Sequence, residues 1–152
     1  MKHLKTYKVF ESKFEESFIK HYNKILPELK DILLPFNDSN IKYRIYEYAD
    51  DYIGEVTIFI EDKKEEFSDD GLKVTKKFCT WKEIKEEILH VISFMDSEGI
   101  PFSKLELQQF ISLKDTLNGE FHNIEIYDES EIEEFEDSLK FTKFEIIFCK
   151  TP

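Results

Sequence analysis

Cysteine is scarce in this chain, and long apolar runs are absent. The two cysteines, Cys79 and Cys149, are too few for a disulfide framework and are not spaced as a paired metal or redox motif. No window of about 18 apolar residues occurs, and residues 1–10 lack the continuous apolar stretch of a signal peptide. These absences predict a cytoplasmic protein with no membrane association.

The residue patterns of common catalytic and cofactor sites are also missing. The four glycines are isolated, so the sequence offers no glycine-rich loop that could bind phosphate groups. The four histidines share no metal-ligand spacing, and no serine lies in a nucleophile-elbow sequence. We therefore expect no cofactor, no metal and no catalytic residue, which predicts a binding protein rather than an enzyme.

Core-forming and acidic side chains are abundant instead. Hydrophobic residues make up 41% of the 152 residues and include 15 Phe, which is enough apolar surface for a folded protein. A chain of this length typically forms one domain, and no repeat or linker divides residues 1–152. The net charge of −12 at pH 7 argues against direct binding to nucleic acid or to anionic lipid.

The spacing of apolar residues predicts the helices and strands. Steps of three and four residues indicate a helix over 10–34, which Pro27 either kinks or restarts, and a second helix from Trp81 to just before Gly99. Branched and aromatic residues that alternate with polar ones predict strands at 41–48, 53–60, 72–79, 105–117, 120–127 and 141–149.

Cap and turn signals add the connections between these elements. Thr80 to Glu83 has the spacing of a capping box, and Ser130 to Glu133 repeats this spacing before a short third helix. Asn118-Gly119 favours a type I′ turn and predicts a hairpin. The order of elements predicts an α+β fold, in which two long helices and one short helix pack on a mainly antiparallel sheet of five to six strands.

The charge is distributed unevenly along the chain. Residues 1–36 carry a net charge of about +2, whereas residues 37–152 carry about −14. Residues 115–139 hold ten acidic residues and no Lys or Arg, and residues 45–70 hold another ten acidic residues with only Lys63 and Lys64. Such runs are commonly solvated faces that keep a protein soluble.

Aromatic residues inside the acidic stretches suggest a second interpretation. Exposed rings supply buried area at an interface, while carboxylates steer a basic partner and pair with its Lys and Arg. Core packing is the competing explanation for these rings. The candidate partner-binding residues are Glu131, Glu133, Glu134, Glu136, Asp137, Tyr46, Tyr48, Tyr52, Tyr127 and Phe135.

In size, charge and element order, with the acidic tract DESEIEEFED at 128–137, the chain resembles the immunity proteins of bacterial toxin systems. This resemblance implies a protein that neutralises a basic toxin domain, often a nuclease, by binding to it directly. Two other hypotheses remain open at this point. The chain could imitate DNA phosphates and inhibit a nucleic-acid-binding protein, or it could be a small metal-dependent enzyme that uses Asp50, Asp51, Asp69 or Asp70.

Overall fold

The centre of the molecule is a six-stranded antiparallel sheet. The computed structural model describes residues 2–61, 66–67, 74–75, 79–112 and 120–152. The strand order is β1-β2-β8-β6-β7, and the short β5 pairs with one end of β8. The strands of this sheet are β1 (Tyr43–Ala49), β2 (Gly54–Ile60), β5 (Cys79–Thr80), β6 (Phe102–Ser112), β7 (Glu120–Ile126) and β8 (Lys140–Lys150). A separate two-stranded ladder joins β3 (Glu66–Phe67) and β4 (Val74–Thr75).

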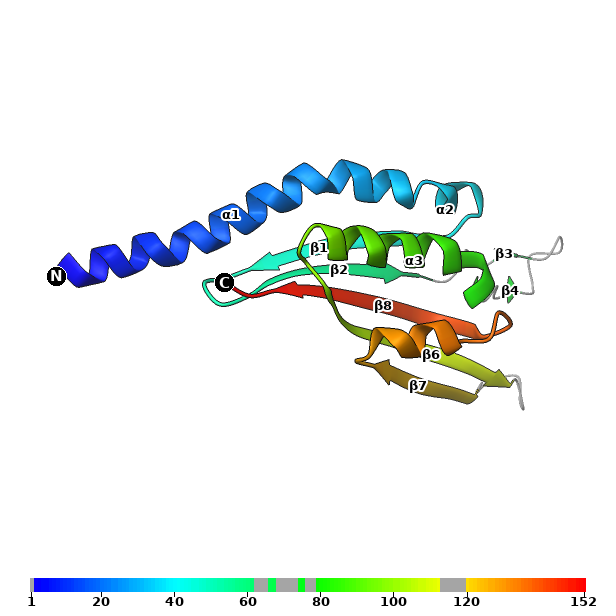
Figure 1. The fold of residues 1–152 in the computed structure, drawn as a ribbon. Coiled ribbons are helices and arrows are strands. Elements are labelled where there is room, and N and C mark those ends of the chain that lie inside the picture. Colours follow the sequence, from blue (N-terminus) through cyan, green and yellow to red (C-terminus); the bar gives the residue numbers. More distant parts are fainter. Residues whose placement is uncertain (1, 62–65, 68–73, 76–78, 113–119) are drawn as a thin grey trace.

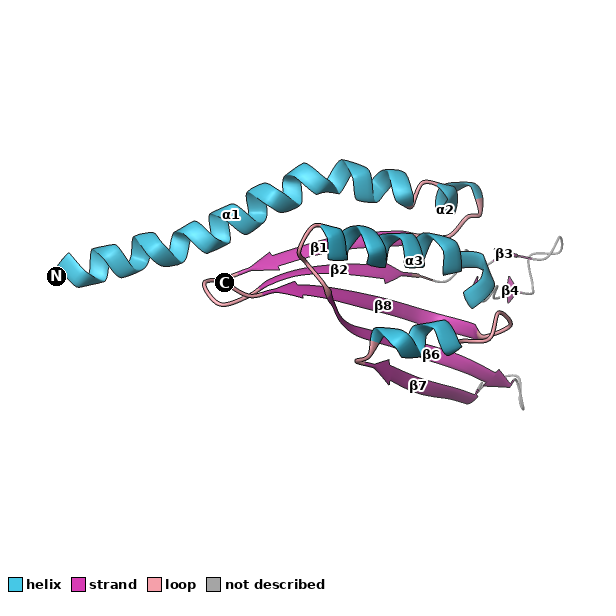
Figure 2. Cartoon of the chain, viewed as in Figure 1, coloured by secondary structure: helices cyan, strands magenta, loops and turns pink. Residues whose placement is uncertain are grey.

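The helices lie on one face of this sheet (Figures 1 and 2). They are α1 (Lys2–Ile32), the one-turn α2 (Pro35–Asp38), α3 (Trp81–Ser97) and the 3₁₀ helix η1 (Glu129–Glu134). Apolar side chains from α1, α3, η1 and the facing side of the sheet form one buried core. The predicted α+β fold with a mainly antiparallel sheet is therefore confirmed.

Helix α1 follows the predicted apolar spacing. Phe18, Tyr22, Ile25 and Leu29 are buried at steps of three and four residues, which places them on the side that meets the sheet. The helix continues through Pro27 and is bent (Figure 1). A proline inside a helix lacks one backbone donor and commonly bends it, so the kink occurs and the restart does not.

The two predicted capping boxes have different outcomes. Thr80 and Glu83 form the first one, in which the Thr80 N–H donates to a Glu83 carboxylate oxygen at 2.9 Å. The second prediction is wrong, because Asp128 rather than Ser130 caps η1 and its carboxylate accepts from the Ser130 N–H at 3.0 Å. The hydrogen bonds that the Asp128 carboxylate accepts from Ser130 lower the pKa of Asp128.

The hairpin of residues 105–127 is present as the pairing of β6 with β7, with Leu105 opposite Ile126. The Asn118-Gly119 turn lies outside the described residues. Within the predicted strand over 72–79, the structure describes only 74–75 and 79, which belong to β4 and β5.

Gly54 allows α1 to approach the sheet closely. A Cβ atom built on Gly54 would overlap the ring of Phe18, so any larger residue must displace this ring or the strand. We expect Gly54→Ala to lower the free energy of unfolding by about 1–3 kcal/mol, the usual cost of overpacking. Urea unfolding would measure this loss. Phe18→Leu should restore part of it in the double variant, and purely additive effects would contradict the contact.

Candidate functional site

The second face of the sheet, which we call the open face, is the candidate site. None of the helices in the described part of the chain covers it (Figure 2). In β2 the even-numbered residues are buried beneath the helices, while Glu55, Thr57 and Phe59 alternate with them and point to the other side. From edge to edge, the open face presents Arg44, Tyr46 and Tyr48 of β1; Glu55, Thr57 and Phe59 of β2; Lys143, Glu145 and Ile147 of β8; Lys104, Glu106 and Gln108 of β6; and Asn123 and Glu125 of β7.

Three glutamates cross the open face in one line. Glu106 of β6 is directly opposite Glu125 of β7 on one side and Glu145 of β8 on the other. Phe59 of β2 follows next in the same row, opposite Glu145. Like charges directly opposite each other destabilise a sheet. These three carboxylates, here called the glutamate row, therefore repel one another in the folded protein, and their repulsion lowers its stability.

Lys104 compensates part of this negative charge. Its ammonium group forms an ion pair with Glu106 and lies 4.0 Å from a carboxylate oxygen of Glu125. It also lies 5.5 Å from the centre of the Tyr127 ring, and the Tyr127 hydroxyl donates to Glu125 at 3.1 Å. The hydrogen bond to Glu106 is the main cause of the raised pKa of Lys104. Glu145 has no such cationic partner among the described residues.

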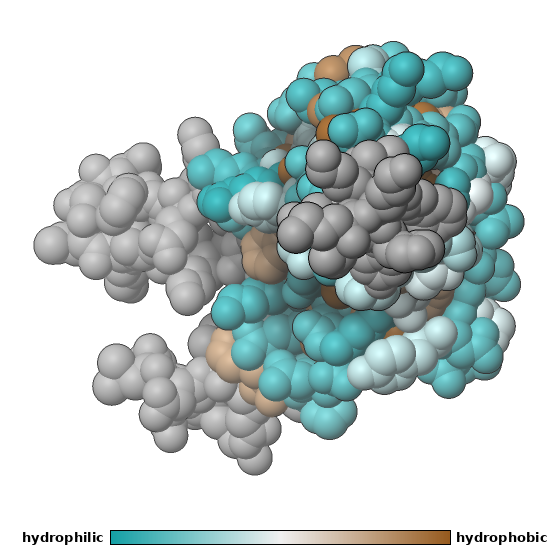
Figure 3. Space-filling view, turned by 90° about the vertical axis from the view of Figure 1, so that its left-hand side faces the viewer, coloured by the Kyte–Doolittle hydropathy of each residue, from teal (hydrophilic) through white to brown (hydrophobic). Residues whose placement is uncertain are grey.

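A shallow hollow lies over the glutamate row. Its volume is about 410 Å³, and the carboxylates share its wall with Phe59, Gln108, Asn123 and Lys143. An apolar ring beside several carboxylates suits a long cationic side chain, because the ring can contact the methylene groups while the carboxylates pair with the charge. Hydrophilic residues make up most of the coloured surface in Figure 3.

The tyrosines predicted as anchors lie at the two ends of the open face. Tyr46 and Tyr48 on β1 are 52% and 55% exposed, and Tyr127 beyond β7 is 64% exposed. Tyr52 is 68% exposed in the turn between β1 and β2. In the same turn, the Asp50 carboxylate accepts from the N–H groups of Tyr52 and Ile53, which lowers its pKa. The Tyr48 hydroxyl donates to this carboxylate at 3.0 Å, and that hydrogen bond raises the pKa of Tyr48.

The predicted acidic residues lie elsewhere, beside the N-terminal end of α3 on the helix side of the sheet. All five of them are exposed, and Lys85 of α3 lies 3.5 Å from a carboxylate oxygen of Asp137. The main-chain carbonyl of Asp137 accepts from Lys82, which ties this segment to α3. The five acidic residues are Glu131, Glu133, Glu134, Glu136 and Asp137. The structure therefore separates them from Tyr46 and Tyr48 and does not join them in one surface.

Phe135 belongs to the core rather than to an exposed surface. Its ring meets Trp81 edge-on, with 5.4 Å between ring centres, and it is only partly exposed. Ile132, three residues earlier, is fully buried. These two side chains hold the acidic segment against the domain.

The alternative based on metal ligands concerns Asp50, Asp51, Asp69 and Asp70, of which the last two lie outside the described residues. Asp50 uses one carboxylate oxygen for the turn hydrogen bonds. Within the described ranges, no group of three His, Cys, Asp or Glu side chains is arranged to hold a metal ion. Cys79 is buried and Cys149 is partly buried, and burial raises the pKa of the Cys149 thiol.

The glutamate row escaped the sequence interpretation. Glu106, Glu125 and Glu145 each occupy a polar position of a strand, where a glutamate is unremarkable by itself. Only the register between β6, β7 and β8 brings them together, and β8 lies far from β6 in sequence. The sequence carries no local signal for the pairing of β6 with β8, so no pattern within it could have found the row.

Comparisons of the chain with protein-family models, with curated proteins and with solved structures find no match. In the part of the chain that the structure describes, no helix is long and apolar enough to cross a membrane.

Replacing Glu145 by Gln tests the repulsion within the glutamate row. We expect Glu145→Gln to raise the free energy of unfolding by about 0.2–1 kcal/mol, because it removes one opposed like charge. Urea unfolding at low salt would show the gain, and added salt should reduce it by screening the charges. Glu131→Gln, at an exposed position of η1, is the matched control. A loss of stability in Glu145→Gln would contradict the repulsion.

Proposed function

We propose that this chain is a non-enzymatic binding protein that holds a basic protein partner on the open face. The observation that carries the proposal is the glutamate row, with Glu106 between Glu125 and Glu145 beneath a hollow. A Lys or Arg side chain of the partner would relieve the repulsion among these carboxylates. Binding would therefore recover free energy that the isolated fold lacks.

The aromatic residues support a protein partner in particular. Tyr46 and Tyr48 stand exposed near one end of the face and Tyr127 near the other, and such rings are enriched among the residues that dominate interface energetics. Arg44, Lys104 and Lys143 interrupt the negative charge on the same face. A mixed-sign surface fits the varied side chains of a protein better than it imitates a regular row of DNA phosphates.

Within this class, we propose an immunity protein that neutralises a basic toxin domain. The net charge of −12 and the exposed acidic residues of η1 support this assignment, because they would attract a basic protein from a distance. The open face would then form the contact, and the acidic segment beside α3 would contribute steering.

The partner can be identified by affinity capture from a lysate of the organism that encodes the chain. The immobilised protein is loaded at low salt, and bound proteins are eluted with a salt gradient and identified by mass spectrometry. One stoichiometric basic protein would support the proposal. A broad set of DNA-binding proteins would favour the DNA-mimic alternative, and retention that does not depend on salt would contradict the electrostatic contact.

A further inference from the structure

Strand β1 leaves hydrogen-bonding groups free at one edge of the sheet. The Glu61 N–H donates to the Lys42 carbonyl at 2.8 Å, and the Asp50 N–H donates to the Ile53 carbonyl at 2.9 Å. Since hydrogen-bonded positions alternate along an antiparallel pair, the even-numbered residues of β1 bond to β2. The backbone N–H and C=O groups of Tyr43, Ile45 and Glu47 therefore point outward, where no described strand pairs with them.

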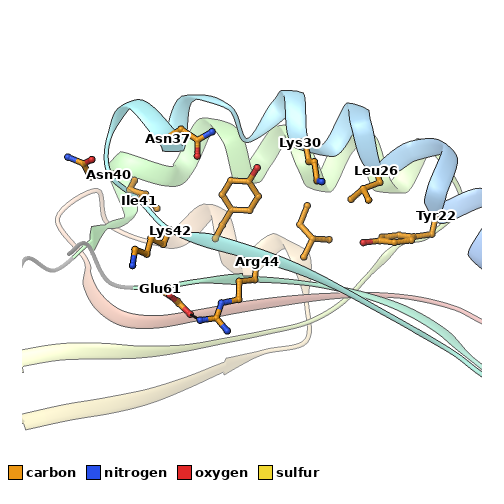
Figure 4. A pocket seen from close by; sticks show the side chains of 11 residues that line it. Tyr22, Leu26, Lys30, Asn37, Asn40, Ile41, Lys42, Arg44 and Glu61 are labelled. Atoms are coloured by element: carbon orange, nitrogen blue, oxygen red, sulfur yellow. Dashed lines mark ion pairs between the residues drawn. The ribbon is translucent and has the colours of Figure 1, made fainter. Parts of the chain in front are cut away.

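A groove runs along this edge between β1 and the C-terminal half of α1 (Figure 4). Its volume is about 720 Å³, larger than that of the hollow on the open face. Its apolar wall is formed by Tyr22 and Leu26 of α1 together with Tyr43 and Ile45 of β1. Tyr43 and Ile45 thus offer outward backbone groups and an apolar side-chain surface at the same place.

The charge of the groove is opposite to that of the whole chain. Lys30 and Lys42 line it and are exposed, and neither lies within ion-pair distance of a carboxylate among the described residues. Glu61 also lines the groove, but its carboxylate is already paired with Arg44 (Figure 4). A protein with net charge −12 therefore presents two lysines without an ion-pair partner among the described residues beside its free sheet edge, where Glu47 is a nearby acidic group.

We propose that this groove binds an extended acidic peptide segment of another protein, which adds to β1 as a further strand. The peptide backbone would pair with Tyr43, Ile45 and Glu47, and its alternate apolar side chains would enter the groove. Its carboxylates would pair with Lys30 and Lys42. The apolar wall of this site lies on the helix side of the sheet, where Tyr43 and Ile45 point, whereas Arg44 at its rim belongs to the open face.

A second copy of the chain is the less favourable occupant. Two copies would each bring a charge of −12, and pairing β1 with β1 would place Lys42 and Arg44 of both copies at one edge. An acidic peptide carries far less negative charge than a second copy, and it brings carboxylates rather than further cations to Lys42 and Arg44.

The proposal is tested with a display library of random twelve-residue peptides selected against the folded protein. The best binder is synthesised with a fluorescent label, which reports its affinity for the protein. Amide hydrogen exchange of the protein, with and without this peptide, is followed by NMR. We expect selected peptides in which acidic and apolar residues alternate. In the free protein the amides of Tyr43, Ile45 and Glu47 should exchange faster than those of Arg44 and Tyr46, and the peptide should protect these three.

Two pairs of variants separate the contribution of the groove lysines from that of the β1 backbone hydrogen bonds. Lys30→Glu with Lys42→Glu should weaken peptide binding about tenfold or more, whereas Lys20→Glu with Lys82→Glu, which changes the net charge equally outside the groove, should change it little. Ile45→Pro should bind about fivefold more weakly than Ile45→Ala, because both lose the side chain but only proline removes the outward donor.

Three results would overturn the proposal. They are a selection that yields no binder, peptides that protect other amides, and protection of the β1 edge in the free protein together with dimers in sedimentation. The last result would assign the edge to a second copy. Thermal unfolding of each variant checks that the protein remains folded.

Discussion

Reversal of two charges in the glutamate row, by Glu106→Lys with Glu145→Lys, should weaken binding of the basic partner about 100-fold or more at low salt. The loss is expected because each variant lysine replaces an attraction to the partner's cations by a repulsion, and close charge pairs at interfaces contribute strongly to affinity. Titration of the captured partner by calorimetry or interferometry at several salt concentrations would measure it. The difference between variant and parent should shrink as salt rises.

A matched control separates local contact from net charge. Glu131→Lys with Glu133→Lys changes the net charge by the same amount at two exposed positions of η1. We expect this control to slow association and to leave dissociation nearly unchanged, as for charges outside a contact. An equal loss of affinity in both double variants would indicate an effect of net charge alone. A loss confined to the control would move the interface to the acidic segment beside α3.

Removal of the Trp81 side chain should cause the largest loss of stability. Trp81 is fully buried at the start of α3, where its ring stacks on Phe144 at 6.2 Å between ring centres and meets Phe135 edge-on. Trp81→Ala leaves a large cavity between the helix, the sheet and the acidic segment. We expect the free energy of unfolding to fall by about 3–5 kcal/mol, measured by urea unfolding followed by circular dichroism.

Trp81→Phe is the informative control for this substitution. The Trp81 indole N–H is buried, and no described residue accepts a hydrogen bond from it. Phenylalanine keeps an aromatic ring and removes this donor, so the loss should be much smaller than for alanine. A loss of less than about 1 kcal/mol in Trp81→Ala would show that Phe135 and Phe144 collapse into the space and that Trp81 does not organise the core.

Most of the fold could be predicted because its elements have strong local signals. The apolar residues of α1 recur at helical spacing, Thr80 and Glu83 satisfy each other's backbone groups, and the apolar positions of β8 alternate. These patterns depend on neighbours within a few residues. The prediction of the η1 cap was wrong because Asp128 and Ser130 are both good capping residues, and the local sequence does not choose between them.

The candidate site was harder to predict than the fold. The exposure of Tyr46, Tyr48, Tyr52 and Tyr127 agrees with the expectation of accessible rings, whereas Phe135 packs on Trp81. Sequence proximity grouped Tyr127 with the acidic tract, but the chain turns after β7 and carries that tract to the helix side. Neighbours in the sequence are thus divided between two surfaces.

The sequence by itself determined the fold class, the presence of α1, α3 and η1, most strands and the excess of negative charge, because composition and short-range periodicity encode them. Only the tertiary structure decided which charges meet. The registers of β6 with β7 and β8 align Glu106, Glu125 and Glu145, and the position of β1 at the sheet edge opens the groove beside α1. Both features arise from strand pairing between distant segments, and such pairing is selected by burial of the whole apolar face rather than by any single polar residue.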